Sequence, residues 1–148
     1  PIGHFSLAAS FGNVHGVYKP GNVKLRPEIL KSSQDLIEKT CGSGPKPLDL
    51  VFQGGSGSEK DKITSAISYG VFKMNIDTDT QFAFAKAIGS YVNENPKAFL
   101  YQVDPEDGTP YKKQYDPRKV FRGAEVSMVE RLDEAFVDLG SVGKSLAQ

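Results

Sequence analysis

Residues 50–77 read LVFQGGSGSEKDKITSAISYGVFKMNID, an apolar run, a glycine-rich turn, a helical pattern and a second apolar run. Short runs of β-branched and aromatic residues that end in turn residues are typical of buried strands. Between the two runs, Ile63, Ala66 and Ile67 recur at helical spacing. Gly70 then follows as the glycine of a left-handed helix end would. The segment therefore predicts a strand, a helix and a second strand.

The same alternation continues on both sides of this segment. Upstream, Pro27 begins a helical pattern whose apolar face is expected to contain Ile29, Leu30, Ser33, Leu36 and Ile37. Downstream, Thr78 and Gln81 form a capping box, and the pattern behind it stops at Asn95-Pro96. Strands are expected at about 5–14, 48–53 and 71–76. This order predicts an α/β fold with parallel strands and crossover helices.

Residues 97–148 have a different character. They begin with a long excursion rich in Lys, Tyr, Asp and Pro, and Asp116-Pro117 is a strong helix start. An apolar stripe then recurs at helical spacing, formed by Val129, Leu132, Phe136 and Leu139. We therefore divide the chain into βα units at 1–96 and an excursion with a C-terminal helix at 97–148. The stripe packs on its own domain or on a partner helix.

Composition excludes several classes of function. The chain has 18 Lys and Arg against 18 Asp and Glu, so no excess of positive charge favours nucleic acid. No apolar run approaches the roughly 18–20 residues of a membrane span. A single cysteine in 148 residues fits a reducing compartment, and we expect a cytoplasmic protein. Cys41 is interpreted as a plain loop thiol.

Polar residues are predicted where the three strands end. His15, Gln53 and Asn75 follow the three apolar runs, and ligands of parallel α/β folds bind outside the carboxyl ends of the strands. Residues 54–58 (GGSGS) lead into a helix, where backbone N–H groups and the helix dipole favour phosphate. Residues 75–80 (NIDTDT) are a second polar strand end before a helix. Either turn alone could be a plain tight turn, and together they favour a phosphate site.

Three basic or imidazole side chains have open interpretations. His15 is a structural residue, a metal ligand or a catalytic group. Lys19 follows it and either meets a phosphate or is solvated. Lys73 shares a strand face with Asn75, and is either paired with an interior carboxylate or a Schiff-base nucleophile. His4 lies near the start of the first strand, and we expect no functional role for it.

Four ordered motifs carry a family resemblance. FGNVHGVYKPGNV (11–23), LVFQGGSGS (50–58), VFKMNIDTDTQ (71–81) and YDPRKVFR (115–122) resemble the later motifs of class II fructose-1,6-bisphosphate aldolases. The resemblance implies a (βα)₈ TIM barrel, with the three strands as its sixth, seventh and eighth. It implies metal-dependent cleavage of fructose 1,6-bisphosphate to dihydroxyacetone phosphate and glyceraldehyde 3-phosphate, in glycolysis and gluconeogenesis.

The resemblance also implies roles for individual residues. His15 matches a zinc ligand, and Asn75 matches an asparagine that orients the substrate. Contacts to substrate and phosphate are implied for Gly16, Lys19, Gly55, Ser56, Asn75, Asp77 and Thr78. A monovalent-cation site is implied at Val14, Gly16, Gly54 and Ser56. Arg118 matches an arginine that reaches the second phosphate from the neighbouring subunit, which implies a homodimer through the C-terminal arm.

Two features depart from the family pattern. Gln53 stands where the family has a second zinc-binding histidine, and a neutral amide oxygen is poorly matched to zinc. The chain also has 148 residues, whereas a (βα)₈ barrel takes typically about 250. We therefore expect the C-terminal portion of an aldolase, without the proton-transfer acid, and inactive when isolated. The alternatives are a tagatose-bisphosphate aldolase and a non-catalytic phosphosugar-binding remnant.

Overall fold

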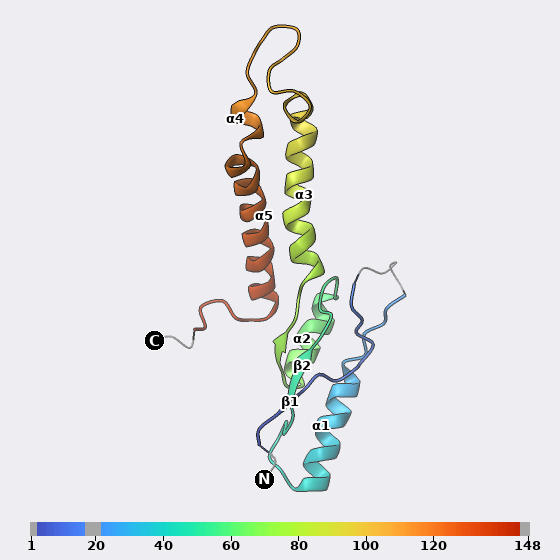
Figure 1. The fold of residues 1–148 in the computed structure, drawn as a ribbon. Coiled ribbons are helices and arrows are strands. Elements are labelled where there is room, and N and C mark those ends of the chain that lie inside the picture. The colour runs from blue at the N-terminus through green and yellow to red at the C-terminus, as the bar shows by residue number, and fades with distance from the viewer. Residues whose placement is uncertain (1–2, 17–21, 146–148) are drawn as a thin grey trace. The chain divides into compact units, whose positions relative to one another are not determined.

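The computed structural model describes residues 3–16 and 22–145, which form two compact units (Figure 1). The first unit comprises residues 1–78 and 136–148, and the second comprises residues 79–135. The first unit contains β1 (Ser6–Leu7), α1 (Glu28–Cys41), β2 (Asp49–Phe52), α2 (Lys60–Ser68) and β3 (Val71–Met74). Its strands alternate with helices as the sequence predicts.

The sheet of the first unit has three parallel strands in the order β1-β2-β3. The central strand β2 buries Leu50, Val51 and Phe52 on both of its faces, as a strand covered on two sides must. Phe52 packs edge-to-face against Phe11, with ring centroids 4.7 Å apart. Because all three strands run in the same direction, their carboxyl ends lie at one edge of the sheet.

The first strand is much shorter than the sequence predicts. It covers Ser6–Leu7 instead of 5–14, and residues 8–16 form an irregular loop. Two local features end the pairing. The backbone N–H of Phe11 donates to the Asn13 side chain at 2.8 Å, and Gly12 adopts a φ of 95°. A backbone held by its own side chains is no longer available to a strand ladder. His15 therefore lies on this loop.

Helix α1 buries most of the expected face, with Leu30 buried and Ile29, Ser33 and Ile37 half-buried, but Leu36 is exposed and Gln34 is buried instead. Leu30 and Gln34 are its buried residues, whereas Leu36 is 62% exposed. The Gln34 amide explains the difference, because it donates to the carbonyls of Leu48 and Tyr69 and accepts from the Leu48 N–H. Cys41 is the last residue of α1 and not a loop residue, and its thiol is exposed and free.

The second unit contains a helical hairpin. It is formed by α3 (Thr78–Glu94) and α5 (Pro117–Asp138), with the short helices η1 (Pro96–Phe99) and α4 (Lys112–Tyr115) between them. The two long helices run antiparallel, with Ser127 Oγ donating to the Ala83 carbonyl and Arg131 paired to Asp79. None of the described helices combines the length and apolar character that a membrane span requires.

Both long helices begin near the predicted residues. Asp116 Oδ1 accepts the N–H of Arg118 at 3.0 Å, so the predicted start at Asp116-Pro117 agrees with the structure. Helix α3 begins at Thr78 itself, one residue earlier than a cap at Thr78 would place it.

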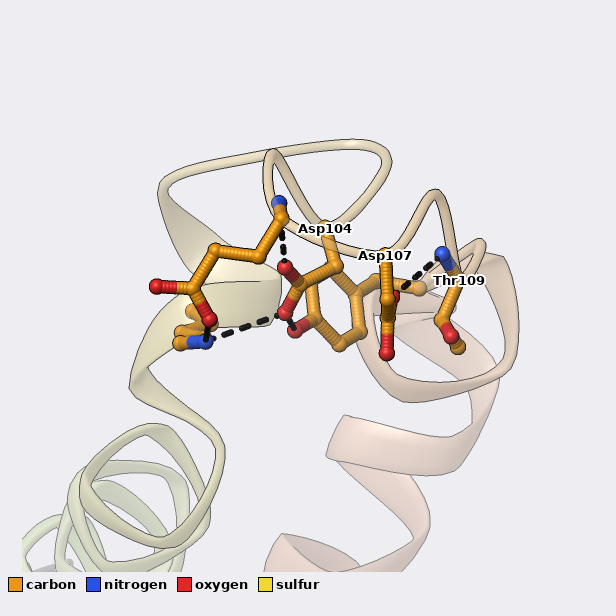
Figure 2. A network of polar contacts seen from close by, with 6 residues as sticks. Asp104, Asp107 and Thr109 are labelled. Atoms are coloured by element: carbon orange, nitrogen blue, oxygen red, sulfur yellow. Dashed lines mark hydrogen bonds and ion pairs between the residues drawn. The ribbon is translucent and has the colours of Figure 1, made fainter.

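The excursion between η1 and α4 is held by a polar network centred on Asp104 (Figure 2). The Asp104 carboxylate accepts from the Tyr111 hydroxyl, from the backbone N–H of Glu106 and from the Lys97 ammonium. Tyr111 is the largest of the influences that hold the pKa of Asp104 far below its ordinary value. A buried carboxylate is stable only when its lone pairs are satisfied in this way.

Candidate functional site

A cavity of about 500 Å³ lies at the carboxyl ends of β2 and β3 in the first unit. It is lined by His15, Gly16, Gln53, Gly54, Ser56, Met74, Asn75, Ile76, Asp77 and Thr78. The structure therefore brings together most of the site residues predicted from the three strand ends. Gly55 lies beside this lining, and Val14 precedes His15 on the same loop. Lys19 lies outside the described residues.

The glycine-rich turn after β2 makes close backbone approaches that other residues would prevent. Gly54 has a φ of 65°, and a Cβ at this position would overlap the carbonyl oxygen of Val14. At Gly55, a Cβ would overlap the side chain of Met74 on β3. The turn is therefore packed between the loop that carries His15 and the neighbouring strand, it needs glycine at position 54, and a side chain at position 55 would displace Met74.

Asn75 is joined to the end of β2 by three hydrogen bonds. Its backbone N–H donates to the Phe52 carbonyl at 2.9 Å, and its carbonyl accepts the Gly55 N–H at 2.9 Å. Its side-chain Nδ2 donates to Gln53 Oε1 at 2.8 Å. The two amide side chains that the sequence predicts at this rim are therefore bonded to each other.

Asn13, which is not among the predicted site residues, fixes the loop that carries His15. Its Nδ2 donates to the Gln53 carbonyl at 2.8 Å, while its Oδ1 accepts the N–H of Phe11. An asparagine beside a glycine just after a strand is a typical turn residue, and this signal could have identified Asn13. His15 follows two residues later with an exposed side chain on the cavity wall.

Asp77 and Thr78 complete the cavity wall at the start of α3. Lys73, the candidate Schiff-base residue, lies on β3 with an exposed side chain. Among the described residues, no carboxylate forms an ion pair with Lys73. The prediction that an interior carboxylate neutralises Lys73 is therefore not met by the described part of this chain. His4 is exposed near β1.

Arg118 belongs to the second unit, on the first turn of α5. Its guanidinium forms two hydrogen bonds with the Asp116 carboxylate, Nε to Oδ1 at 3.0 Å and Nη2 to Oδ2 at 2.6 Å. This pairing lowers the pKa of Asp116 to about 2. The Arg118 side chain is 89% exposed and lines a hollow of about 750 Å³ with Lys113, Lys119 and Arg122. The arginine is thus oriented by Asp116 while its charge stays accessible.

The described residues do not by themselves fit a zinc site. Within the described ranges, no group of three or more His, Cys, Asp or Glu side chains is arranged so that it could hold a metal ion. His15 is the imidazole on this cavity wall, and the neighbouring Gln53 offers an amide oxygen that already accepts a hydrogen bond. Zinc in proteins takes four ligands, or three with water, and prefers nitrogen and sulfur.

Comparison with known proteins gives a consistent result. The model of the family described as "Fructose-bisphosphate aldolase class-II" matches residues 2–144. The fructose-bisphosphate aldolase of Corynebacterium glutamicum is 54% identical over 148 residues, a match that covers 99% of this chain and 42% of that protein. The chain therefore spans about two-fifths of the length of such curated relatives, and corresponds to their C-terminal part.

Solved structures give the same result. The fructose-bisphosphate aldolase of Campylobacter jejuni matches with a TM-score of 0.84 and 53% identity, over 95% of this chain and 41% of that one. The YdjI aldolase of Escherichia coli matches with a TM-score of 0.57 and 26% identity, over 94% and 40% of the two chains. The described fold is therefore similar to part of these larger aldolases.

Proposed function

The chain belongs to the class II fructose-bisphosphate aldolase family, and we propose that it forms the C-terminal part of such an enzyme's substrate site. The reaction is the reversible cleavage of fructose 1,6-bisphosphate into dihydroxyacetone phosphate and glyceraldehyde 3-phosphate. One observation carries the proposal: groups from the ends of three successive βα units line one cavity of about 500 Å³. We place the enzyme in the cytoplasm, where the exposed Cys41 thiol stays reduced.

The phosphate of the dihydroxyacetone moiety binds at the turn 54–58 and at the start of α3. Because Gly54 and Gly55 have no side chains, a ligand can come as close to their backbone as the Val14 carbonyl and the Met74 side chain do. A helix N-terminus favours an anion because its N–H groups and dipole point outward. Phosphate contacts are proposed for Gly16, Lys19, Gly55, Ser56, Asp77 and Thr78. A monovalent cation is proposed at Val14, Gly16, Gly54 and Ser56.

Asn75 orients the sugar backbone between these phosphate contacts and the reacting carbons. Its position supports this role, because three hydrogen bonds fix it at the end of β3. An amide held in one orientation can distinguish donors from acceptors on a ligand. Correct orientation of the reacting group is a large part of catalysis in such sites.

The family is metal-dependent, and we propose zinc as the metal. His15 supplies one imidazole, and the remaining ligands come from regions that the relatives have and this chain does not span. The proton-transfer acid is assigned to those regions as well. The residues of this chain therefore contribute binding and orientation of the phosphorylated ketose.

Arg118 is proposed to reach the second phosphate of the substrate from the neighbouring subunit of a homodimer. Its 89% exposure and its two-point attachment to Asp116 support this role, because the guanidinium is directed and still able to meet a phosphate. In an active chimera that carries this chain as the C-terminal part of the Corynebacterium glutamicum aldolase, we expect Arg118→Ala to raise the KM for fructose 1,6-bisphosphate about tenfold or more without changing zinc content. Arg26→Ala, which removes an exposed arginine that is likewise paired to a carboxylate two residues away but lies outside this hollow, is the matched control. An unchanged KM would make Arg118 an ordinary surface arginine.

A chimera tests the proposed function directly. The matching C-terminal 42% of the Corynebacterium glutamicum aldolase would be replaced by this chain, with Gln53 or with Gln53→His. We expect the Gln53→His chimera to bind zinc and to cleave fructose 1,6-bisphosphate faster than tagatose 1,6-bisphosphate. We expect the Gln53 chimera to be weaker in both zinc content and cleavage.

The chimera also tests a second function, which the amide at position 53 favours. A non-catalytic phosphosugar-binding protein would retain dihydroxyacetone phosphate and cleave neither bisphosphate, even with Gln53→His. A folded Gln53→His chimera with that behaviour would contradict the aldolase proposal. If Gln53→His alters neither zinc content nor rate in an active chimera, position 53 has no metal role.

A further inference from the structure

Gln53 is fixed at the rim by hydrogen bonds to both of its carbonyl groups. Its backbone carbonyl accepts from Asn13 Nδ2, and its side-chain Oε1 accepts from Asn75 Nδ2, each at 2.8 Å. The backbone of Asn75 is bonded to Phe52, which precedes Gln53, and to Gly55, two residues after it, through the Phe52 carbonyl and the Gly55 N–H. Gln53 therefore lies between two asparagines that come from the other two βα units of the site.

We propose that Gln53 acts in this chain as a positioning residue for Asn75 and not as a metal ligand. The inference rests on the proposed function, in which Asn75 orients the sugar. A side-chain amide has one donor end and one acceptor end. Because Oε1 of Gln53 accepts from the nitrogen of Asn75, a flip of the Asn75 amide would place two acceptor oxygens against each other. With its Oε1 toward Asn75, Gln53 thus holds Nδ2 of Asn75 toward β2 and leaves Oδ1 as the acceptor for a ligand hydroxyl.

The chemistry of Gln53 fits this role better than metal ligation. An amide oxygen is neutral and hard, and suits calcium or magnesium better than zinc beside imidazole. Removal of the Gln53 side-chain oxygen would leave the Asn75 Nδ2 without this acceptor. The loss would be about the free energy of one hydrogen bond. A histidine at the position would offer the metal a nitrogen. The amide instead gives Asn75 a second attachment besides its backbone.

This arrangement predicts a separation between the sugar and the phosphate parts of the ligand. The phosphate binds at the turn 54–58, whose shape is set by glycines and by its packing on Val14 and Met74. The hydroxyl and carbonyl groups of dihydroxyacetone phosphate meet Asn75. Loss of the Gln53 acceptor should therefore weaken dihydroxyacetone phosphate binding and leave inorganic phosphate binding nearly unchanged.

The test uses the ¹⁵N-labelled 148-residue chain with three variants. Gln53→Leu removes the acceptor, and Gln53→Glu retains an acceptor oxygen at similar size. Gln102→Leu makes the same chemical change at an exposed position of the second unit and serves as control. Each protein is titrated with dihydroxyacetone phosphate, with inorganic phosphate and with Zn²⁺, and the Asn75 side-chain NH₂ signals are followed by NMR.

We expect Gln53→Leu to shift the Asn75 NH₂ signals and to raise the Kd for dihydroxyacetone phosphate about five- to tenfold. One neutral hydrogen bond corresponds to roughly a factor of ten at most, which sets this upper limit. The Kd for inorganic phosphate should change less than twofold, because phosphate binds at the turn 54–58 and not at Asn75. The carboxylate of Gln53→Glu repels dihydroxyacetone phosphate and inorganic phosphate alike. The ratio of the Kd for dihydroxyacetone phosphate to the Kd for phosphate should therefore stay near that of the parent. Zn²⁺ affinity should be the same in the parent and in Gln53→Leu.

Three results would overturn the inference. They are unchanged Asn75 NH₂ signals in Gln53→Leu, an equal loss of affinity for both phosphate ligands, and a tenfold loss of Zn²⁺ affinity. If the parent chain binds neither phosphate nor dihydroxyacetone phosphate, the proposed half-site fails. The NH₂ signals and the Zn²⁺ titration then decide the role of Gln53 independently.

Discussion

Gly54 joins the loop that carries His15 to the end of β2. Its φ of 65° and the overlap that a Cβ would make with the Val14 carbonyl are two separate obstacles to a side chain. A left-handed conformation costs an ordinary residue about 1–2 kcal/mol, and overpacking adds about 1–3 kcal/mol. We therefore expect Gly54→Ala to lower the free energy of unfolding by about 2–5 kcal/mol, measured by urea denaturation.

Gly57 provides a matched control three residues later. Its φ is 70°, and a Cβ there would meet no atom within 4 Å. Gly57→Ala should therefore lower the free energy of unfolding by about 1–2 kcal/mol, the conformational part alone. Equal losses in the two variants would show that the contact with Val14 contributes nothing to the stability of the turn.

The residues of the site could be predicted in part. His15, Gln53 and Asn75 were predictable because each follows an apolar run, and parallel strands place such residues at one edge. Asn13 could be identified only as a turn residue beside Gly12, because its two hydrogen bonds go to backbone groups of Phe11 and Gln53 and leave no periodic pattern in the sequence. The pairing of Gln53 with Asn75 also depends on side-chain orientation, which spacing does not give.

At the scale of elements, α1 is attached to the sheet by one polar side chain. Gln34 is 3% exposed and makes three hydrogen bonds, two to Leu48 and one to the Tyr69 carbonyl. Gln34→Leu keeps the size but leaves these backbone groups without their partner. Because orphaned buried groups cost about 1–3 kcal/mol, we expect a loss of about 2–3 kcal/mol in unfolding free energy.

Chemical denaturation checks this, with Ser32→Ala as the control. Ser32 is exposed on the same helix and bonds only the Glu28 carbonyl, so its substitution should change stability by less than about 0.5 kcal/mol. An unchanged free energy of unfolding in Gln34→Leu would mean that water replaces the lost hydrogen bonds. The sequence could not identify Gln34, because a glutamine at this spacing is indistinguishable from a solvated one.

The excursion of the second unit has a pH dependence that follows from Asp104. Its pKa is held far below the ordinary value, first by the Tyr111 hydroxyl and then by the Glu106 N–H and Lys97. A depressed carboxyl pKa stabilises the fold above the unfolded value near 4, and this contribution is lost as the pH falls further. Tyr111→Phe removes the largest cause and should destabilise the protein at pH 7.

The difference between parent and Tyr111→Phe should be constant from pH 7 to below pH 4 and shrink as the pH falls through the lowered folded-state pKa of Asp104 in the variant, because protonated Asp104 no longer benefits from the hydroxyl. Urea unfolding at pH 7, 4 and 3 measures this. Tyr101→Phe, at an exposed tyrosine of the same segment, controls for loss of a phenol. A difference that grows below pH 4 would show that Asp104 is not the responsible group.

At the scale of the whole molecule, the predicted fold class is confirmed. The alternation of apolar runs and helical patterns predicted three βα units, and the structure has a parallel sheet in the order β1-β2-β3. The match to the Campylobacter jejuni aldolase, with a TM-score of 0.84, agrees with the barrel family named by the motifs. The end of β1 was not predictable, because the Asn13 side chain competes with the strand ladder and the apolar pattern continues past it.

The set of catalytic groups in the whole molecule limits the reactions of the isolated chain. Its described residues place one imidazole, His15, on the cavity and no group of three metal-binding side chains elsewhere. The chain spans 42% of the Corynebacterium glutamicum aldolase, and the resemblance assigns the proton-transfer acid to the remainder. Binding groups without a complete metal site or an acid can hold a phosphosugar but cannot break its C3–C4 bond.

We therefore expect no cleavage of fructose 1,6-bisphosphate by the purified 148-residue chain in a coupled assay with added Zn²⁺. The intact Corynebacterium enzyme at equal concentration is the positive control, and cleavage by the chain that EDTA abolishes would show that these residues complete a working site.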